Sequence, residues 1–243
     1  MNIVKVLIFL ILSSGVADAA PLVEKYGRFE INWSTHRLRF FGYGDEGDFS
    51  KSEKAAWKDG LKYLVRELPQ VLSKLSPGSQ SIDFKAGERV ASATYRVKTV
   101  YYSNGSARVL MESQLSRAFS PKLADFIINE PSTEASRNSK IVIRLDRPIR
   151  PSPLFKVIVN GETVYSYKSV AASSFRRGLV GSFFVWDKSQ APKSIVGRNP
   201  IVIFGKVSSE GIIVSEGDWR RAIRGNQPIL SRAGIAVSFP GRG

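Results

Sequence analysis

The sequence predicts an α+β fold, with an N-terminal ββαββ unit that contains one long amphipathic helix and a strand-rich C-terminal unit with a short helix. Three observations predict it. Apolar residues recur at spacings of three and four between positions 57 and 75, as on one face of a helix. Runs rich in β-branched and aromatic residues flank that stretch and fill the C-terminal half. A polar, turn-rich segment at 129–139, interpreted as a linker, separates residues 20–128 from residues 140–243.

The first unit is organised around its helix. Short strands are predicted at 28–33 and 37–41, before the helix. Ser50 and Glu53 have the spacing of a capping box, which predicts that the helix begins there. Its expected apolar face consists of Trp57, Leu61, Leu64, Leu68, Leu72 and Leu75. Pro69 lies within this stretch, and because proline lacks an amide donor we expect a kink or an early end there.

A hairpin is predicted after the helix. The β-rich runs at 94–102 and 107–115 meet near Asn104-Gly105, and this dipeptide favours the tight turn of a β-hairpin. Residues 118–128 are expected to add a short helix. The order of these elements gives the ββαββ pattern of the first unit.

The C-terminal unit is predicted to consist mainly of strands. They are expected at 140–145, 155–159, 163–167, 179–186, 200–207, 212–214 and 234–239. Asn160-Gly161 joins the second and third of these as another hairpin. After Ser215 a short helix is predicted, because its acidic residues come first and its arginines come last, which matches the helix dipole.

The N-terminus has the pattern of an export signal at 1–19. A positive start, a seven-residue apolar core at 6–12 and small residues at Ala17 and Ala19 predict cleavage after Ala19. That core is shorter than the roughly 20 residues that span a bilayer, so we expect a protein that is not transmembrane. The chain contains no cysteine, so the new N-terminus cannot carry a lipid. We therefore expect a periplasmic protein that is exported and not lipidated.

The composition excludes several kinds of site. Without cysteine, thiol redox chemistry and the usual Cys/His zinc sites cannot form, and His36 is the only histidine. His36 is expected to be a turn residue and not a general base. We expect neither a cofactor nor a bound metal, although acidic residues leave an all-oxygen calcium site open as an alternative.

One motif invites a different interpretation. Gly42, Gly44 and Gly47 fit the G-x-G-x-x-G fingerprint of dinucleotide-binding proteins, between a strand and a helix. However, Asp45 and Asp48 would place negative charge beside the pyrophosphate. We therefore interpret the motif as a glycine-rich turn near a helix start.

Catalytic signatures are also missing from the sequence. There is no G-x-S-x-G elbow, and no lysine follows a serine by three residues. We expect a protein that is not an enzyme. A hydrolase of cell-wall material, with carboxylates brought together by folding, stays open as the less favoured alternative.

Clustered arginines are the candidate binding residues. The chain carries 36 Lys and Arg against 21 Asp and Glu, and residues 139–243 alone hold 17 against 6, a net charge of +11. Guanidinium groups bind phosphate and carboxylate through paired hydrogen bonds. The predicted partner- or anion-binding residues are Arg144, Arg147, Arg150, Arg176, Arg177, Trp219, Arg220, Arg221 and Arg224. We expect an acidic protein partner, an acidic polymer or an anionic lipid, and no nucleic acid, because no recognition motif for it is present.

Part of the sequence resembles a known family. Ile31-Asn-Trp33, then Arg37-Leu-Arg-Phe-Phe-Gly42-Tyr-Gly44 and the following helix with Ala55-Ala56, resemble the start of LPP-twenty-like envelope lipoproteins of Gram-negative bacteria. Further similar pieces are Asp146-Arg147, the prolines to Pro153-Leu154, Gly161-Glu162-Thr163-Val164-Tyr165, Gly178-Leu179-Val180-Gly181 and Gly197-Arg198-Asn199-Pro200.

The resemblance implies an exported α+β protein held at the envelope, and some relatives are associated with flagellar outer-membrane disks or motor structures. It implies no catalytic residues. This chain departs from the family in lacking the lipidated cysteine and in carrying Lys54, Trp57, Lys58 and Lys62 on the helix.

Together these observations predict a non-enzymatic structural or assembly protein of the periplasm. It would belong to a flagellar or other envelope-spanning machine, oligomeric within that assembly, and dock an acidic partner through its basic C-terminal unit. The alternative of another class is a binding module for peptidoglycan or lipopolysaccharide.

Overall fold

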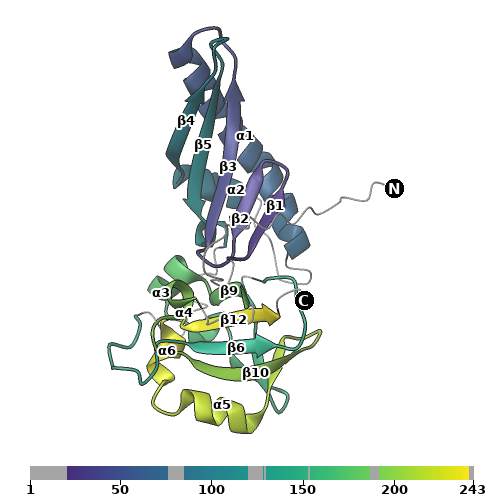
Figure 1. Ribbon diagram of the computed structural model, residues 1–243, viewed down its shortest axis with the longest axis vertical. Coiled ribbons are helices and arrows are strands. Elements are labelled where there is room, and N and C mark those ends of the chain that lie inside the picture. The colour runs from purple at the N-terminus through teal and green to yellow at the C-terminus, as the bar shows by residue number, and fades with distance from the viewer. Residues whose placement is uncertain are drawn as a thin grey trace. The chain divides into compact units, whose positions relative to one another are not determined.

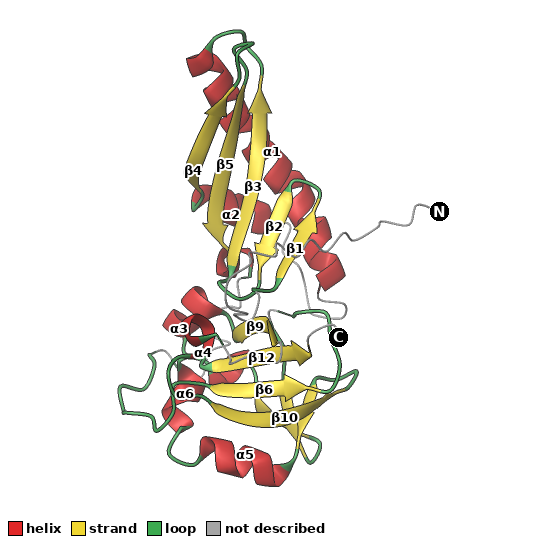
Figure 2. Ribbon diagram, in the orientation of Figure 1, coloured by secondary structure: helices red, strands yellow, loops and turns green. Residues whose placement is uncertain are grey.

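The computed structural model describes residues 21–75, 85–119, 128, 130–152, 154–186 and 192–240. The predicted export signal lies outside them. The described chain forms two compact units. It contains both helices and strands in two sheets, which confirms the α+β class (Figure 2).

The N-terminal unit is a five-stranded antiparallel sheet with helices on one face (Figure 1). Its strands lie in the order β1-β2-β3-β5-β4. In chain order the elements are β1 (Val23–Tyr26), β2 (Phe29–Asn32), β3 (Arg37–Gly44), α1 (Phe49–Leu75), α2 (Ala86–Ser92), β4 (Tyr95–Tyr101), β5 (Ala107–Gln114) and the 3-10 turn η1 (Leu115–Ala118). Neither β1 nor α2 was expected from the sequence. The helix predicted at 118–128 falls almost entirely outside the described residues.

Helix α1 packs on the sheet through one row of residues four apart. The row consists of Ser52, Ala56, Gly60, Leu64, Leu68 and Leu72, all buried. The predicted leucine face is therefore correct at Leu64, Leu68 and Leu72, and the side chain of Leu75 lies outside what the structure describes. Nearer the start, Trp57 and Leu61 are only half-buried, and small residues face the sheet instead. The helix continues through Pro69 to Leu75, so the early end expected there is wrong.

The start of α1 also differs from the prediction. The side chain of Asp48 accepts a hydrogen bond from the Lys51 amide at 2.9 Å, so Asp48 is the capping residue and not Ser50. Glu53 does not complete a capping box. Its carboxylate accepts hydrogen bonds from Thr99 at 3.2 Å and Tyr101 at 2.6 Å, because β4 brings these hydroxyls to it.

The glycines of the G-x-G-x-x-G motif have a packing role. A Cβ atom at Gly42 would lie 2.0 Å from the Ala56 carbonyl oxygen, and one at Gly44 would lie 2.0 Å from that of Ser52. Both glycines belong to β3 and only Gly47, with φ of 68°, lies in the turn that follows. The interpretation as a glycine-rich turn is therefore right for Gly47 alone. Gly42 and Gly44 allow the α1 backbone to approach the strand.

The C-terminal unit is built on a seven-stranded mixed sheet in the order β8-β7-β11-β10-β6-β12-β9 (Figure 1). Its strands are β6 (Ile141–Leu145), β7 (Val157–Val159), β8 (Glu162–Tyr165), β9 (Gly181–Trp186), β10 (Ile201–Val207), β11 (Ile212–Val214) and β12 (Ile235–Pro240). The neighbours β10, β6, β12 and β9 run parallel. Every predicted strand is present, and Asn160-Gly161 forms the turn between β7 and β8 with positive φ at both residues.

This unit contains more helices than the single short one that the sequence predicted. They are η3 (Tyr167–Ser169), α3 (Ala172–Gly178), α4 (Lys193–Val196), α5 (Glu216–Ile223) and α6 (Gln227–Ser231). The one short helix that was expected is α5, capped by the Ser215 hydroxyl. The others have three to seven residues, too few to give a periodic pattern.

The C-terminal unit includes residues from early in the chain, namely Pro21, Leu22 and Trp33–Thr35. Trp33 is fully buried, and its ring meets that of Phe183 edge-on with 6.2 Å between centroids. The Ser34 hydroxyl donates a hydrogen bond to the Phe183 carbonyl at 2.6 Å.

The segment interpreted as a linker is also part of this unit. The amide of Ser132 donates to the Ser231 hydroxyl at 3.0 Å, and that of Arg137 donates to the Gly225 carbonyl at 3.0 Å. The segment's described residues are thus held by specific hydrogen bonds, and the linker interpretation is wrong for them. Across the described ranges, no helix has the length and apolarity needed to cross a bilayer.

Candidate anion-binding site

An arginine- and asparagine-lined cleft lies at the amino ends of β6 and β10. It has a volume of about 320 Å³ and is lined by Arg137, Asn138, Asn199, Ile201, Arg221, Arg224 and Asn226. The parallel register that pairs Ile141 with Ile201 brings together the segments preceding both strands. Helix α5 and the turn after it supply the remaining residues. We call this site the arginine cleft.

Asn226 fixes one wall of the arginine cleft. Its side chain is fully buried. Its Oδ1 accepts a hydrogen bond from the Asn138 amide at 2.8 Å, and its Nδ2 donates to Asn138 Oδ1 at 3.0 Å and to the Ala222 carbonyl at 2.8 Å. Because these bonds use both ends of the amide group, the segment before β6 is held firmly against the end of α5.

Asn199 fixes the opposite wall. Its carbonyl accepts a hydrogen bond from Asn138 Nδ2 at 3.1 Å, and its own Nδ2 donates to the Arg137 carbonyl at 3.3 Å. Ser139 extends this contact, since its hydroxyl donates to the Val196 carbonyl at 2.8 Å. The backbone that carries Arg137 is thereby bonded on both sides.

The arginine cleft is positively charged. Arg221 forms an ion pair with Asp218 at 2.6 Å on the exposed side of α5. Arg137 and Arg224 are exposed and form no ion pair with any described residue. No acidic side chain is among its described lining residues. The cleft therefore offers several donors to an anion, while its lining contains no side chain suited to act as a nucleophile or general base.

Only part of the predicted binding set lies in the arginine cleft. Arg221 and Arg224 line it. Arg220 instead forms an ion pair with Glu216 one helical turn earlier. Trp219 is only 6% exposed and packs in the core, so it does not line the cleft. Helix α5 packs against β10, and the tryptophan covers the sheet while the arginines face outward.

The other predicted arginines are dispersed. Arg144 on β6 lies over the Trp186 ring, with 5.4 Å from its guanidinium carbon to the ring centroid. Arg147 donates to the Val207 carbonyl at 3.3 Å. Arg150 follows in an exposed segment, and Arg176 and Arg177 occupy the last turn of α3. None of these five lines the arginine cleft.

Sequence reasoning missed Arg137 and the three asparagines. Arg137 and Asn138 were assigned to the linker, where polarity suggested exposure. A usable signal was present: Arg-Asn precedes two β-branched runs, as Arg137-Asn138 before β6 and as Arg198-Asn199 before β10. If two such strands are parallel neighbours, the polar pairs come together at one edge of the sheet.

A second cavity adjoins the first. Its volume is about 260 Å³, and it is lined by Ser136, Asn138, Ser139, Lys140, Ile229, Arg232 and Gly234. Asn138 is common to both. Burial lowers the pKa of Lys140 to about 8. We call it the serine–lysine cavity.

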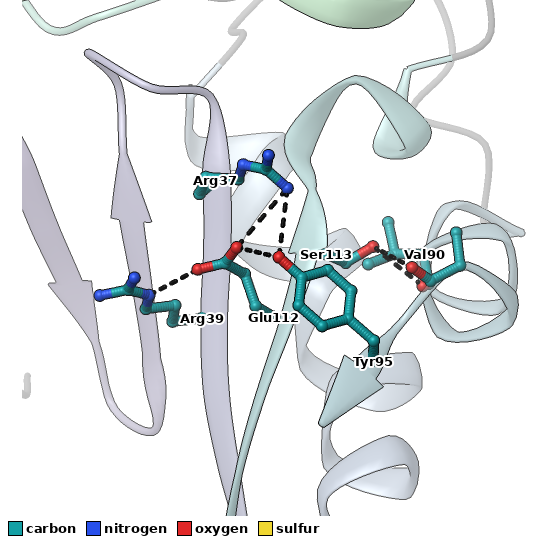
Figure 3. A network of polar contacts seen from close by, with 7 residues as sticks. Arg37, Arg39, Val90, Tyr95, Glu112 and Ser113 are labelled. Carbon is teal, nitrogen blue, oxygen red and sulfur yellow. Dashed lines mark hydrogen bonds and ion pairs between the residues drawn. The ribbon is translucent and has the colours of Figure 1, made fainter. Parts of the chain in front are cut away.

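The N-terminal unit carries a separate polar network on its sheet (Figure 3). Glu112 on β5 accepts hydrogen bonds from Arg39 at 2.7 Å and from the Tyr95 hydroxyl, and Arg37 lies 3.5 Å from it. Burial alone would raise the pKa of Glu112, but the hydrogen bonds from Tyr95 and Arg39 outweigh it and the pKa is lowered. Because this carboxylate is held ionised by its partners, it is poorly suited to general acid catalysis.

In the described part of the chain, no three or more His, Cys, Asp or Glu side chains are grouped as ligands for an ion. No known family model matches this sequence, and no curated protein matches it either.

Proposed function

We propose that the protein is a non-enzymatic structural or assembly component of the bacterial envelope, which docks an acidic partner through the arginine cleft. One observation carries the proposal. Arg137 and Arg224 line the cleft from two separate segments without an ion pair, beside Arg221, which is paired with Asp218, and none of the described lining residues is acidic. The two guanidinium groups that lack a carboxylate partner repel each other, and a bound anion would offset that repulsion.

The place of action is part of the proposal. The predicted export signal and the resemblance to LPP-twenty-like proteins support a periplasmic protein associated with a flagellar or other envelope-spanning machine. The absence of cysteine means that attachment has to come from protein surfaces or from charge. An acidic envelope or motor protein is therefore the proposed partner, within an oligomeric assembly.

The rigid walls of the arginine cleft support recognition by docking. Asn138, Asn199 and Asn226 keep the arginine backbones fixed before any partner arrives. Such preorganisation lowers the entropy lost on binding. The cleft also lies at the amino ends of the parallel strands, whereas open α/β sheets usually bind cofactors at the carboxyl ends.

Crosslinking in cells tests the proposal. The tagged protein should recover envelope-machine components, and the double variant Arg137→Gln with Arg224→Gln should lose most of them. The matched control is Arg144→Gln with Arg147→Gln, which removes the same charge at β6 and after it, outside the cleft. Equal recovery by both double variants, or no envelope component in any sample, would contradict the proposal.

The alternative function is that of a binding module for peptidoglycan or lipopolysaccharide. The size of the cleft supports this alternative. Small-ligand pockets range from about 300 to 1,000 Å³, and the cleft, at about 320 Å³, would fit one anionic head group. Sedimentation with purified sacculi or with lipopolysaccharide, compared between the same two double variants, distinguishes this alternative from a protein partner. The hydrolase alternative has less support, because the cleft has no carboxylate.

A further inference from the structure

The serine–lysine cavity lies beside the arginine cleft and has its own set of donors. Ser136 and Lys140 come from the segment that enters β6, and Arg232 comes from the turn after α6. Among the residues that the structure describes, none that lines the cavity is acidic. At about 260 Å³, it is smaller than the roughly 300 to 1,000 Å³ of sites for larger ligands. It therefore suits a compact anion.

The hydroxyl group of Ser136 makes the cavity unusual. Its oxygen is shielded from solvent and forms no hydrogen bond with any described residue. Buried polar groups in proteins nearly always have a partner, and an orphaned one costs about 1 to 3 kcal/mol. Because water does not reach this oxygen, a ligand in the cavity would meet the hydroxyl only after the serine side chain turned toward it, and the hydrogen bond formed then would remove that cost.

Two cationic side chains, those of Lys140 and Arg232, line the same cavity as Ser136. Lys140 is half-buried and forms no ion pair with the described residues, and burial is the only cause of its altered titration. Arg232 is anchored at the cavity rim: it donates through Nε to the Ser132 carbonyl at 2.8 Å and through Nη2 to the Glu134 carbonyl. A guanidinium group has five N–H donors, so others stay available to a ligand. Uncompensated positive charge thus lies beside an unsatisfied hydroxyl.

We propose that the serine–lysine cavity binds a phosphate group, whose oxygens accept hydrogen bonds from the Ser136 hydroxyl, the Lys140 ammonium and the Arg232 guanidinium. Phosphate fits better than carboxylate, because it presents enough oxygens for three separate donors. Lysine commonly binds phosphate as a point charge, and arginine binds it through paired N–H groups. This site is distinct from the arginine cleft and does not depend on the partner proposed for it.

Calorimetric titration of the purified protein with inorganic phosphate, at low ionic strength and pH 7, tests this proposal. Lys140→Met and Ser136→Ala should each weaken binding roughly tenfold or more, as expected for the loss of a hydrogen bond to a charged group. The matched controls are Lys206→Met and Ser209→Ala, exposed positions outside both cavities, which should bind as the unaltered protein does. Thermal unfolding by circular dichroism verifies that each variant is folded.

The outcomes separate this site from the arginine cleft. No phosphate binding by the unaltered protein overturns the proposal. Binding that is lost in Arg137→Gln but kept in Lys140→Met would place the phosphate in the arginine cleft and also overturn it, while leaving the proposed docking function untouched. A parallel titration with methyl phosphate identifies the source: binding as strong as that of inorganic phosphate indicates a phosphate ester of a larger molecule, and weaker binding indicates the free ion.

Discussion

Lys140 carries its charge at an energetic cost to the fold. Burial lowers its pKa from 10.5 to about 8, and no neighbouring carboxylate offsets the effect. Between these two values the unfolded chain binds more protons than the folded one, so stability rises with pH in that window. Below pH 8 both states are charged, and the folded state bears a penalty of about 1 to 3 kcal/mol. A residue that destabilises its own fold is a candidate for a binding role.

Replacing this lysine should therefore stabilise the protein. Lys140→Met is expected to raise the free energy of unfolding by about 1 to 3 kcal/mol at pH 7, because the buried charge is removed. Urea unfolding at pH 7 and at pH 10.5 measures the change, and the gain should shrink at the higher pH. Lys206→Met serves as the exposed control. An unchanged or lower stability of Lys140→Met at pH 7 would contradict the burial argument.

Glu112 has the opposite effect on stability. Its pKa is lowered, so the ion-paired form stabilises the fold above the ordinary glutamate value of 4.5, and this contribution is lost as the pH falls through the folded-state value. Glu112→Gln should lower the free energy of unfolding by about 1 to 3 kcal/mol at pH 7, because Arg39 and Tyr95 lose a charged acceptor.

Unfolding at pH 7 and again well below pH 4.5 verifies the Glu112 prediction, since the difference from the unaltered protein should narrow in acid. The exposed Glu46→Gln provides the control at both pH values. If the difference in the free energy of unfolding between Glu112→Gln and the unaltered protein stayed constant with pH, the loss of stability would come from packing and not from charge.

At the scale of elements, the contact between α1 and β3 depends on glycine. A side chain at Gly42 would collide with the backbone of Ala56 and Gly60, and backbone cannot move aside as a flexible side chain can. Gly42→Ala should therefore cost about 2 kcal/mol or more, because the helix has to be displaced. Gly217 on α5 has open space around it, and Gly217→Ala should stabilise by about 0.4 to 1 kcal/mol. Urea unfolding measures the free energy of unfolding of both variants. An equal change in the two variants would refute the packing argument.

Elements with local signals were the predictable part of the fold. The Asn104-Gly105 and Asn160-Gly161 hairpins follow from residues that tolerate positive φ, and the leucine spacing of α1 follows from helical periodicity. The helix start was mispredicted because Asp48 competes with Ser50 for the cap, and tertiary contacts with β4 engage Glu53. The parallel order of β10, β6, β12 and β9 has no local signal, since it depends on pairing between distant segments.

In the candidate site, too, the residues with a local signal were the predictable ones. Arg221 and Arg224 could be found because a helix places them by its own period. Arg137 has no such local signal, because its place in the cleft depends on Asn226 and Asn199, which are distant in the sequence. The Arg-Asn pairs before β6 and β10 point to it only if these strands are taken to be parallel neighbours. Polarity suggested a free linker there, whereas the polar groups bond to other parts of the same unit.

At the scale of the whole molecule, the C-terminal unit depends on residues near the start of the chain. Trp33→Ala should lower the free energy of unfolding of that unit by about 3 to 5 kcal/mol, because the fully buried ring leaves a cavity beside Phe183. Hydrogen exchange of β9 and β12 amides measures this, since these strands adjoin the site of the lost ring. Trp57→Ala, at a half-buried position of α1, is the control and should leave those amides protected.

The position of Trp33 and Ser34 in the chain also constrains folding in time. Ser34 and Phe183, whose hydroxyl and carbonyl are hydrogen-bonded, are 149 residues apart in the sequence. The ribosome delivers the first long before the second, so the core of the C-terminal unit stays incomplete until most of the chain has been synthesised. Contacts of such separation form slowly, because a long loop has to close first. A chain that ends before Phe183 would therefore lack the carbonyl that accepts from Ser34 and the ring that meets Trp33 edge-on.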